Sequence, residues 1–287
     1  MLQRLIVCDQ TQRLYPMTAF VLFTVLVSWG FAHYYLPPSP SYRIFPDISP
    51  TWATIGVLIA ANVAIKGAWL VMPLWPFLTR YFMHVPGYPH AIQAVLNVFS
   101  HIQYEHLLAN MMMLALVGPV CHDLVGRGAF IGTYLSAGAV GTLVSLYWAN
   151  LGRGNIAAHS VGASAAIWGI AALYCLLTDQ DKIKIPFVKD MEVAFWPKML
   201  LFAFVALDIR MAFSGRSKND HASHFGGMLV GMSTAGYMRA TGVHNKKAEL
   251  PQGVQDKANV DSKTVDVGAI AKEGIKEVKE AFGKGSK

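Results

Sequence analysis

Residues 160–178 read Ser-Val-Gly-Ala-Ser-Ala-Ala-Ile-Trp-Gly-Ile-Ala-Ala-Leu-Tyr-Cys-Leu-Leu-Thr. This stretch carries no charged side chain and is long enough to cross a hydrocarbon core of about 30 Å as a helix. Its apolar residues are continuous and do not alternate, which excludes a strand of a transmembrane barrel. Within it lies Ser164, a polar side chain in a setting where polar groups are costly and usually have a function.

Apolar stretches of this kind recur along the whole chain. Hydrophobic residues make up 54% of the sequence, and charged residues make up 14%, against roughly 25% in a soluble domain. Because lipid accepts only helices or closed barrels, the sequence predicts an all-α, polytopic membrane protein. The expected spans are residues 17–36, 51–71, 105–121, 129–149, 160–178, 194–212 and 221–239.

Composition divides the chain into three regions. Residues 1–50 hold the first span and a proline-rich linker, residues 51–241 form the membrane core, and residues 242–287 form a polar tail. Within the core, the aromatic and proline-rich segment 72–104 is predicted to be an interfacial loop. The tail is expected to be a mobile solvated segment, or to form one amphipathic helix over residues 267–282.

Charge and cysteine content narrow the class of protein further. The net charge is +7, but the lysines gather in the tail and in short loops, without the aromatic-studded groove of a nucleic-acid site. We therefore expect a lipid bilayer as the environment and no nucleic acid as a partner. Cys8, Cys121 and Cys175 are far apart in sequence and lie in or beside apolar runs, so the sequence predicts free buried thiols.

A second polar residue in an apolar stretch suggests chemistry for Ser164. His224 lies in His-Ala-Ser-His-Phe-Gly-Gly-Met-Leu-Val-Gly, residues 221–231. A serine becomes a nucleophile only when a base takes its proton, and an imidazole is such a base. Gly227 and Gly231 have the spacing of a close helix contact, and Gly227 lies three residues after His224, on the same helix face. This face is predicted to bring the imidazole against a neighbouring helix.

The third span contributes two further polar groups. His106 and Asn110 are four residues apart and share a helix face, so they can act as neutral donors to an oxyanion. Each polar residue also has a structural alternative: Asn110 can bond to a neighbouring helix, and Ser164 can bond to a carbonyl of its own helix. Together the four residues supply the nucleophile, base and donors that acyl transfer needs.

The sequence predicts a Ser–His dyad, because the spans that hold these residues contain no acidic side chain in their interior. Trp168 follows Ser164 by one helical turn, and we expect its ring to stack on His224 and orient the imidazole. The alternative chemistry is a metal site, since His221 and His224 have the i, i+3 spacing of helical zinc ligands. There is no HExxH motif, and a third ligand would have to come from elsewhere in the fold. We therefore expect no metal and no other cofactor.

These positions, in this order, resemble the rhomboid family of intramembrane serine proteases, from the second expected span to the seventh. The matching motifs are His106-x-x-x-Asn110, Gly162-x-Ser164 and His224-x-x-Gly227-x-x-x-Gly231. The resemblance implies a six-helix catalytic core, preceded here by one additional transmembrane helix. It implies Ser164 as nucleophile and His224 as base, with His106, Asn110 and the backbone N–H of Ser164 as the oxyanion hole.

Two runs look most like the mitochondrial, presenilin-associated rhomboid-like branch. They are Tyr-Leu-Ser-Ala-Gly-Ala at 134–139 and Asp-His-Ala-Ser-His-Phe-Gly-Gly at 220–227. That branch adds one span before the core, as segment 17–36 does here. The resemblance implies the mitochondrial inner membrane, with a secretory-pathway membrane as the alternative. It also implies single-span membrane proteins as substrates, a mitochondrial dynamin-like GTPase among them.

One position departs from the family pattern, and two other functions compete with proteolysis. The family usually has glycine directly after the serine, where this chain has Ala165, whose methyl group either narrows the pocket or is accommodated by local packing. A non-catalytic relative that binds transmembrane helices is the alternative function, but such a protein has no need to keep the nucleophile, base and oxyanion donors. A transporter would line its spans with charges, and Lys66 and Asp208 are almost the only ones well inside.

Overall fold

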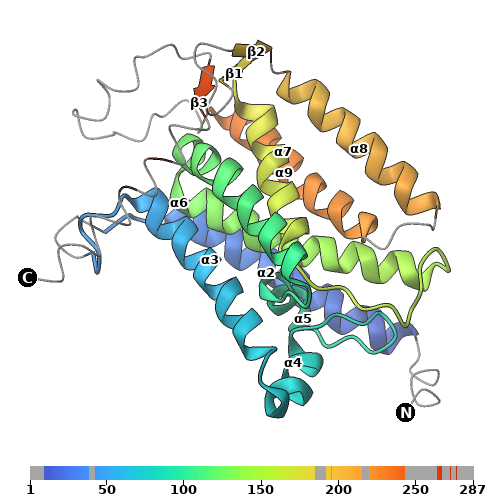
Figure 1. Ribbon diagram of the computed structural model, residues 1–287. Coiled ribbons are helices and arrows are strands. Elements are labelled where there is room, and N and C mark those ends of the chain that lie inside the picture. The colour runs from blue at the N-terminus through green and yellow to red at the C-terminus, as the bar shows by residue number, and fades with distance from the viewer. Residues whose placement is uncertain are drawn as a thin grey trace, which may run out of the picture.

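The computed structural model describes residues 10–38, 43–184, 192–194, 196–214, 220–242, 264–266, 272 and 276. The fold is a helical bundle (Figure 1), as predicted for a polytopic helical membrane protein. At its centre is α6 (Tyr104–Asn150), which contacts α2 (Gln10–Tyr34), α3 (Pro50–Ala68), α7 (Ser164–Leu177) and α9 (His221–Thr241). The remaining long helix, α8 (Pro197–Ser214), lies against α9 and α7.

Helix α6 contains two of the predicted spans. At Gly126 the backbone takes φ 81° and ψ 163°, a left-handed conformation that favours glycine and breaks the helix into two arms. The arms contain the expected spans 105–121 and 129–149. Counting the arms separately, the described residues form the additional helix α2 followed by six helices of 14 or more residues, which confirms the predicted arrangement of one plus six.

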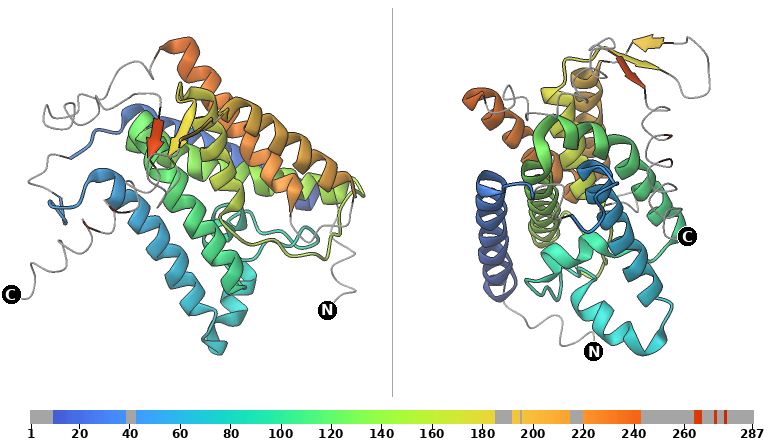
Figure 2. Two further views of the ribbon diagram at one scale, coloured as in Figure 1. Left: turned by 45° about the horizontal axis from the view of Figure 1, so that its top comes forward. Right: turned by 90° about the vertical axis from the view of Figure 1, so that its left-hand side faces the viewer.

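The bend in α6 is tied to the start of α3 and the end of α2 through one side chain. The guanidinium of Arg127 donates to the carbonyl of Pro50 at 2.8 Å, the hydroxyl of Thr54 at 2.9 Å and the hydroxyl of Tyr35 at 3.0 Å. Its charge is thus spread over three acceptors in a partly buried site. In the right-hand view of Figure 2, α2 (dark blue) lies along one side of the bundle, next to α6.

In the part of the chain that the structure describes, three helices, α2, α3 and α6, are long and apolar enough to span a membrane by length and composition. Helix α7 has only 14 residues, or about 21 Å at 1.5 Å per residue. The predicted span 160–178 was therefore too long at its start, because residues 160–163 are not helical. The predicted first span began too late and the sixth too early. Their helices begin at Gln10 and Pro197.

The segment between α3 and α6 is not a span, as predicted for 72–104, and its place at the membrane interface stays a prediction. It contains four short helices and no long one. They are η2 (Met72–Leu74), α4 (Trp75–Tyr81), α5 (Gln93–Leu96) and η3 (Asn97–Phe99). Exposed aromatic side chains on this segment include Trp75, Phe77 and Tyr88.

Outside the helical bundle lies a small sheet that the all-α prediction did not include. β1 (Lys182–Lys184) pairs antiparallel with β2 (Glu192–Ala194) and parallel with β3 (Thr264–Asp266), which belongs to the tail. Most of the tail lies outside the described residues, and so does the predicted amphipathic helix apart from 272 and 276, which are helical. Cys121 and Cys175 are buried free thiols, as predicted, whereas Cys8 lies outside the described residues.

Candidate active site

Ser164 begins α7, and its side chain meets the imidazole of His224 near the start of α9. The Oγ of Ser164 lies 2.9 Å from Nε2 of His224. Because α7 begins at Ser164, no helical turn precedes the serine to which its hydroxyl could bond. Ser164 and His224, which the sequence predicted to act together, are therefore within hydrogen-bond distance in the fold.

The residues that lead into Ser164 are held by the segment between α3 and α6. Ser160 and His84 exchange two backbone hydrogen bonds of 3.0 and 2.8 Å. The backbone N–H of Gly162 donates to the carbonyl of Asn97 at 3.0 Å, and the side-chain amide of Asn97 donates to Thr142 on α6 at 3.0 Å. These bonds hold the non-helical residues before Ser164 against the segment between α3 and α6.

His101 is a part of the site that sequence analysis missed. Its Nε2 accepts a hydrogen bond from the backbone N–H of Ala163 at 3.3 Å, and its ring meets that of His106 edge to face at 5.1 Å. Burial lowers the pKa of His101 to about 3, helped by the nearby charges of His106 and Lys66. His101 therefore stays neutral at physiological pH and keeps the lone pair that Ala163 needs.

Helix α9 packs on α7 through glycines, as the sequence predicted. A Cβ added at Gly227 would lie 2.0 Å from the carbonyl oxygen of Ala165, and one added at Gly231 would lie 2.0 Å from that of Gly169. Neither position has room for any side chain. Because Gly227 is on the same face as His224, this backbone contact holds the imidazole opposite Ser164.

An acidic residue reaches the imidazole, contrary to the prediction of a dyad. Asp208 of α8 is 5% exposed, and its Oδ1 lies 3.4 Å from Nδ1 of His224, at the long end of the hydrogen-bond range. The same oxygen is bonded to Nδ1 of His221. A carboxylate can only accept, so Nδ1 of His224 carries the hydrogen in this contact. Its Nε2 is then left with a lone pair facing Ser164.

The predicted stacking of Trp168 on His224 is wrong. The two rings are 6.1 Å apart and tilted by 45°, so they touch at an angle without stacking. Trp168 lies closer to Phe204 of α8, at 4.9 Å. The tryptophan thus fills the space between α7 and α8, and the hydrogen bond of Asp208 is the contact that sets the tautomer of His224.

His106 stands beside the approach to the serine because Gly162 has no side chain. A Cβ at Gly162 would lie 2.6 Å from Cε1 of His106, and the glycine has φ +132°, which other residues rarely adopt. The ring of His106 therefore lies beside Gly162, which precedes Ser164 by two residues. The role of His106 as an oxyanion donor stays a prediction.

Gly162→Ala should lower cleavage of a membrane reporter by at least about 10²-fold, because the new methyl group displaces His106 and loss of one oxyanion donor alone has that effect. Backbone strain should add about 1–3 kcal/mol of destabilisation. Gly152→Ala is the matched control, since Gly152 has φ +73° in the same loop but nothing within 4 Å. Equal losses of activity in both variants would show that the loss does not come from the collision with His106.

Asn110 makes a bond that neither reading of the sequence anticipated. Its side-chain amide donates to the carbonyl of His106 at 2.9 Å, within the same helix, and the residue is buried. The amide has two N–H groups, so one remains for another acceptor. The interhelical bond considered for Asn110 is not what the structure shows.

Asn110→Ala should weaken cleavage on the order of 10²–10³-fold without abolishing it, because His106 and the N–H of Ser164 remain as donors. Labelling of Ser164 by a small activated phosphonate should persist, and it measures the nucleophile separately from the oxyanion donors. A wild-type cleavage rate would show that Asn110 serves only the structure of α6.

The methyl group of Ala165 is accommodated by a glycine on a facing helix. Ala165 is buried, and a Cβ added at Gly141 of α6 would lie 2.7 Å from the Ala165 Cβ. Gly141 thus provides the space that the methyl group occupies. The departure from the family pattern is matched locally by packing.

Ala165→Gly is expected to lower both stability and turnover. Glycine costs about 1 kcal/mol in a helix, and removing the methyl group leaves a void against Gly141. Thermal unfolding and reporter cleavage measured on the same preparation test this expectation. A clear rise in turnover with unchanged substrate affinity would mean that the alanine restrains the enzyme.

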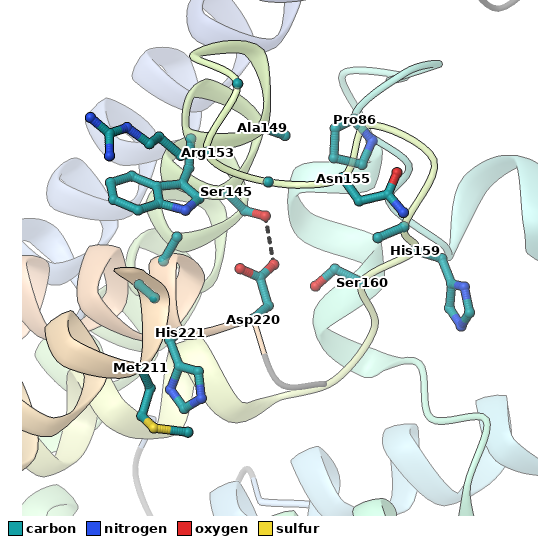
Figure 3. Close-up of a pocket in the computed structure, with 16 residues that line it drawn as sticks. Pro86, Ser145, Ala149, Arg153, Asn155, His159, Ser160, Met211, Asp220 and His221 are labelled. Carbon is teal, nitrogen blue, oxygen red and sulfur yellow. Dashed lines mark hydrogen bonds between the residues drawn. The ribbon is translucent and has the colours of Figure 1, made fainter. Parts of the chain in front are cut away.

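A cavity of about 500 Å³ opens beside the start of α9. Figure 3 shows His221 and Met211 on one side of it, and His159 and Ser160 on the other. Between them, the carboxylate of Asp220 accepts from the hydroxyl of Ser145 at 2.6 Å (Figure 3). It also accepts from the backbone N–H of Ser223 at 3.1 Å. Asp220 therefore caps α9 and fastens it to α6.

Comparisons with known proteins identify relatives of this chain. The Rhomboid domain family model matches residues 88–241. Presenilin-associated rhomboid-like protein A, mitochondrial, of Danio rerio is 33% identical over 185 residues, 64% of this chain and 47% of that protein. Presenilin-associated rhomboid-like protein, mitochondrial, of Homo sapiens is 31% identical over 187 residues, 65% of this chain and 48% of that protein. Rhomboid protein 1, mitochondrial, of Saccharomyces cerevisiae is 28% identical over 205 residues, 71% and 57% of the two lengths. The chain spans about half the length of these relatives. No solved structure gives a significant match.

Proposed function

Because the chain belongs to the rhomboid family, we propose that it is an intramembrane serine protease that cleaves transmembrane segments of single-span membrane proteins. The observation that carries this proposal is the 2.9 Å contact between Ser164 Oγ and His224 Nε2 at the start of a short helix. A nucleophile and a base in hydrogen-bond reach are the minimum that acyl transfer requires.

In the proposed reaction, Ser164 Oγ attacks the scissile carbonyl while Nε2 of His224 takes the hydroxyl proton. The Nδ1–H of His224 points at Asp208, which orients the ring and favours the imidazolium that forms. His224 then passes the proton to the leaving amine, and water releases the acyl group from Ser164. Asp208 is thus a positioning residue, which extends the predicted dyad.

The negative charge of the tetrahedral intermediate needs donors beside Ser164. The first backbone N–H groups of a helix have no partner within the helix, and α7 has no side-chain cap. We assign the N–H of Ser164, His106 and Asn110 to this oxyanion hole. The helix N-terminus adds a favourable field for the charge.

The names of the relatives and the apolar helices support a location in a mitochondrial membrane. We propose the inner membrane, with the protein crossing it several times, and membrane proteins of a single span as substrates, including a dynamin-like GTPase. Residues 1–50, 51–241 and 242–287 are proposed as the N-terminal segment, the catalytic core and the tail.

Labelling with a fluorophosphonate probe in detergent tests the enzyme class. The full chain should form one covalent adduct, located on Ser164 by peptide mass spectrometry, and Ser164→Ala should form none. Ser160→Ala should label like the wild type, because only the backbone of Ser160 holds His84. A folded wild-type chain that does not react would favour a non-catalytic binder of transmembrane helices.

A further inference from the structure

Three side chains with metal-binding atoms converge beside the catalytic base. They are Asp208 of α8 and His221 and His224 of α9, and one ligand atom of each lies within 4.8 Å of the others. In the part of the chain that the structure describes, this is the one group of three His, Cys, Asp or Glu residues so placed. The sequence supplied the two histidines but no third ligand, and the fold supplies it from a different helix.

The donor set suits a zinc ion. Two imidazoles and one carboxylate are a common set of protein ligands for zinc, and they leave the fourth position of a tetrahedron open. Ligand atoms about 2.05 Å from a tetrahedral ion lie about 3.3 Å apart. Nδ1 of His224 and Oδ1 of Asp208 are already 3.4 Å apart, whereas the bonded atoms of His221 and Asp208 lie closer together than two ligands of one ion and would have to move apart to that spacing.

An ion has a route to this group. His221 lines the cavity of about 500 Å³ beside the start of α9, whereas Asp208 is buried and bonded to His221. Figure 3 shows His221 among the residues that line this cavity. A hydrated ion can therefore reach His221 first and then exchange its water for the other two ligands.

We propose that Asp208, His221 and His224 form an inhibitory zinc site that switches off the catalytic histidine. The inhibition rests on the proposed protease function, whereas the binding does not. Zinc would bind His224 in its other neutral tautomer: Nδ1 gives up its proton to solvent and binds the ion through the freed lone pair, while Nε2 takes up one proton from solvent. The ring stays neutral, with zinc on Nδ1 and its single proton on Nε2. With its lone pair lost, Nε2 can no longer accept the hydrogen of Ser164 Oγ.

Zinc binding is measured first on the purified full-length Ser164→Ala variant, which needs no activity. We expect about one zinc per chain by calorimetry and elemental analysis after desalting. His221→Ala and, as a conservative second variant, His221→Gln should lower the affinity at least about tenfold. His159→Ala is the matched control, because His159 lines the same cavity without belonging to the group. No bound zinc, or equal affinity in all variants, would overturn the site.

Inhibition is measured by phosphonate labelling of Ser164 in the wild-type chain. Free zinc at about 100 times the measured Kd should slow labelling about 100-fold, and a chelator should restore it. The same zinc should have little effect on His221→Ala relative to that variant's own zinc-free rate. Loss of activity on chelation would overturn the inhibitory role. Zinc binding without any labelling of the zinc-free wild type would overturn the protease proposal and leave the zinc site standing.

Discussion

Ser164→Ala is expected to abolish cleavage of a single-span reporter while leaving expression and thermal stability nearly unchanged. The variant loses the attacking oxygen, and loss of a nucleophile lowers turnover by a factor on the order of 10⁴–10⁶. The fold should tolerate the change, because the serine hydroxyl bonds to His224 and the backbone contacts around it come from neighbouring residues. Cleavage is followed by the appearance of the two reporter fragments, and unfolding by a thermal scan in detergent.

The control for this variant is Ser160→Ala, four residues earlier in the chain. Its side chain faces the cavity and its backbone bonds to His84 are preserved by alanine, so cleavage should remain close to wild type. Full residual cleavage by Ser164→Ala would refute the assignment of the nucleophile. Ser160 would then be the next residue to test.

His224→Ala is expected to be as inactive as Ser164→Ala, whereas His221→Ala should retain at least about a tenth of the wild-type rate in chelator-treated buffer. Only His224 contacts the serine hydroxyl; His221 contacts the carboxylate of Asp208. Removing His221 leaves that carboxylate to His224 alone. Reporter cleavage and phosphonate labelling measure the two variants side by side.

The opposite result for His221 and His224 would contradict this assignment of the base. If His221→Ala were inactive while its thermal unfolding matched the wild type, His221 would belong to the catalytic machinery. The base would then need to be reassigned. Activity retained by His224→Ala would refute a serine mechanism based on this imidazole.

Much of the fold could be predicted because membrane helices are encoded locally. A run of apolar residues must form a helix in lipid, so the number and order of the helices followed from segments such as 129–149 and 221–239. The ends of helices were less predictable. Residues 160–163 carry no charge and continue into an apolar run, yet Gly162 donates a backbone hydrogen bond to Asn97 and Ser160 exchanges two with His84, which holds these residues outside α7.

The candidate site was predictable where one residue type has few other uses in a membrane. The pairing of Ser164 with His224 was predicted in this way, and Gly227 and Gly231 indicated which helix face would be packed. The roles of His106 and Asn110 as oxyanion donors stay predictions. Trp168 was misread because its distance along the helix was known but the competing surface of Phe204 was not. His101 lies in an irregular segment, where periodicity carries no information about neighbours.

Three features followed from the sequence alone: that the chain lies in a membrane, the order of its helices, and the pairing of a serine with a histidine. Each of these depends on residue type and short-range spacing. The tertiary structure decided which groups surround that pair. Asp208 lies on a different helix from His224, and only the packing of α8 against α9 brings their atoms within 3.4 Å. Likewise Ala165 is accommodated because Gly141 faces it across the bundle. Such contacts depend on the positions of helices distant in sequence, which a one-dimensional pattern does not specify.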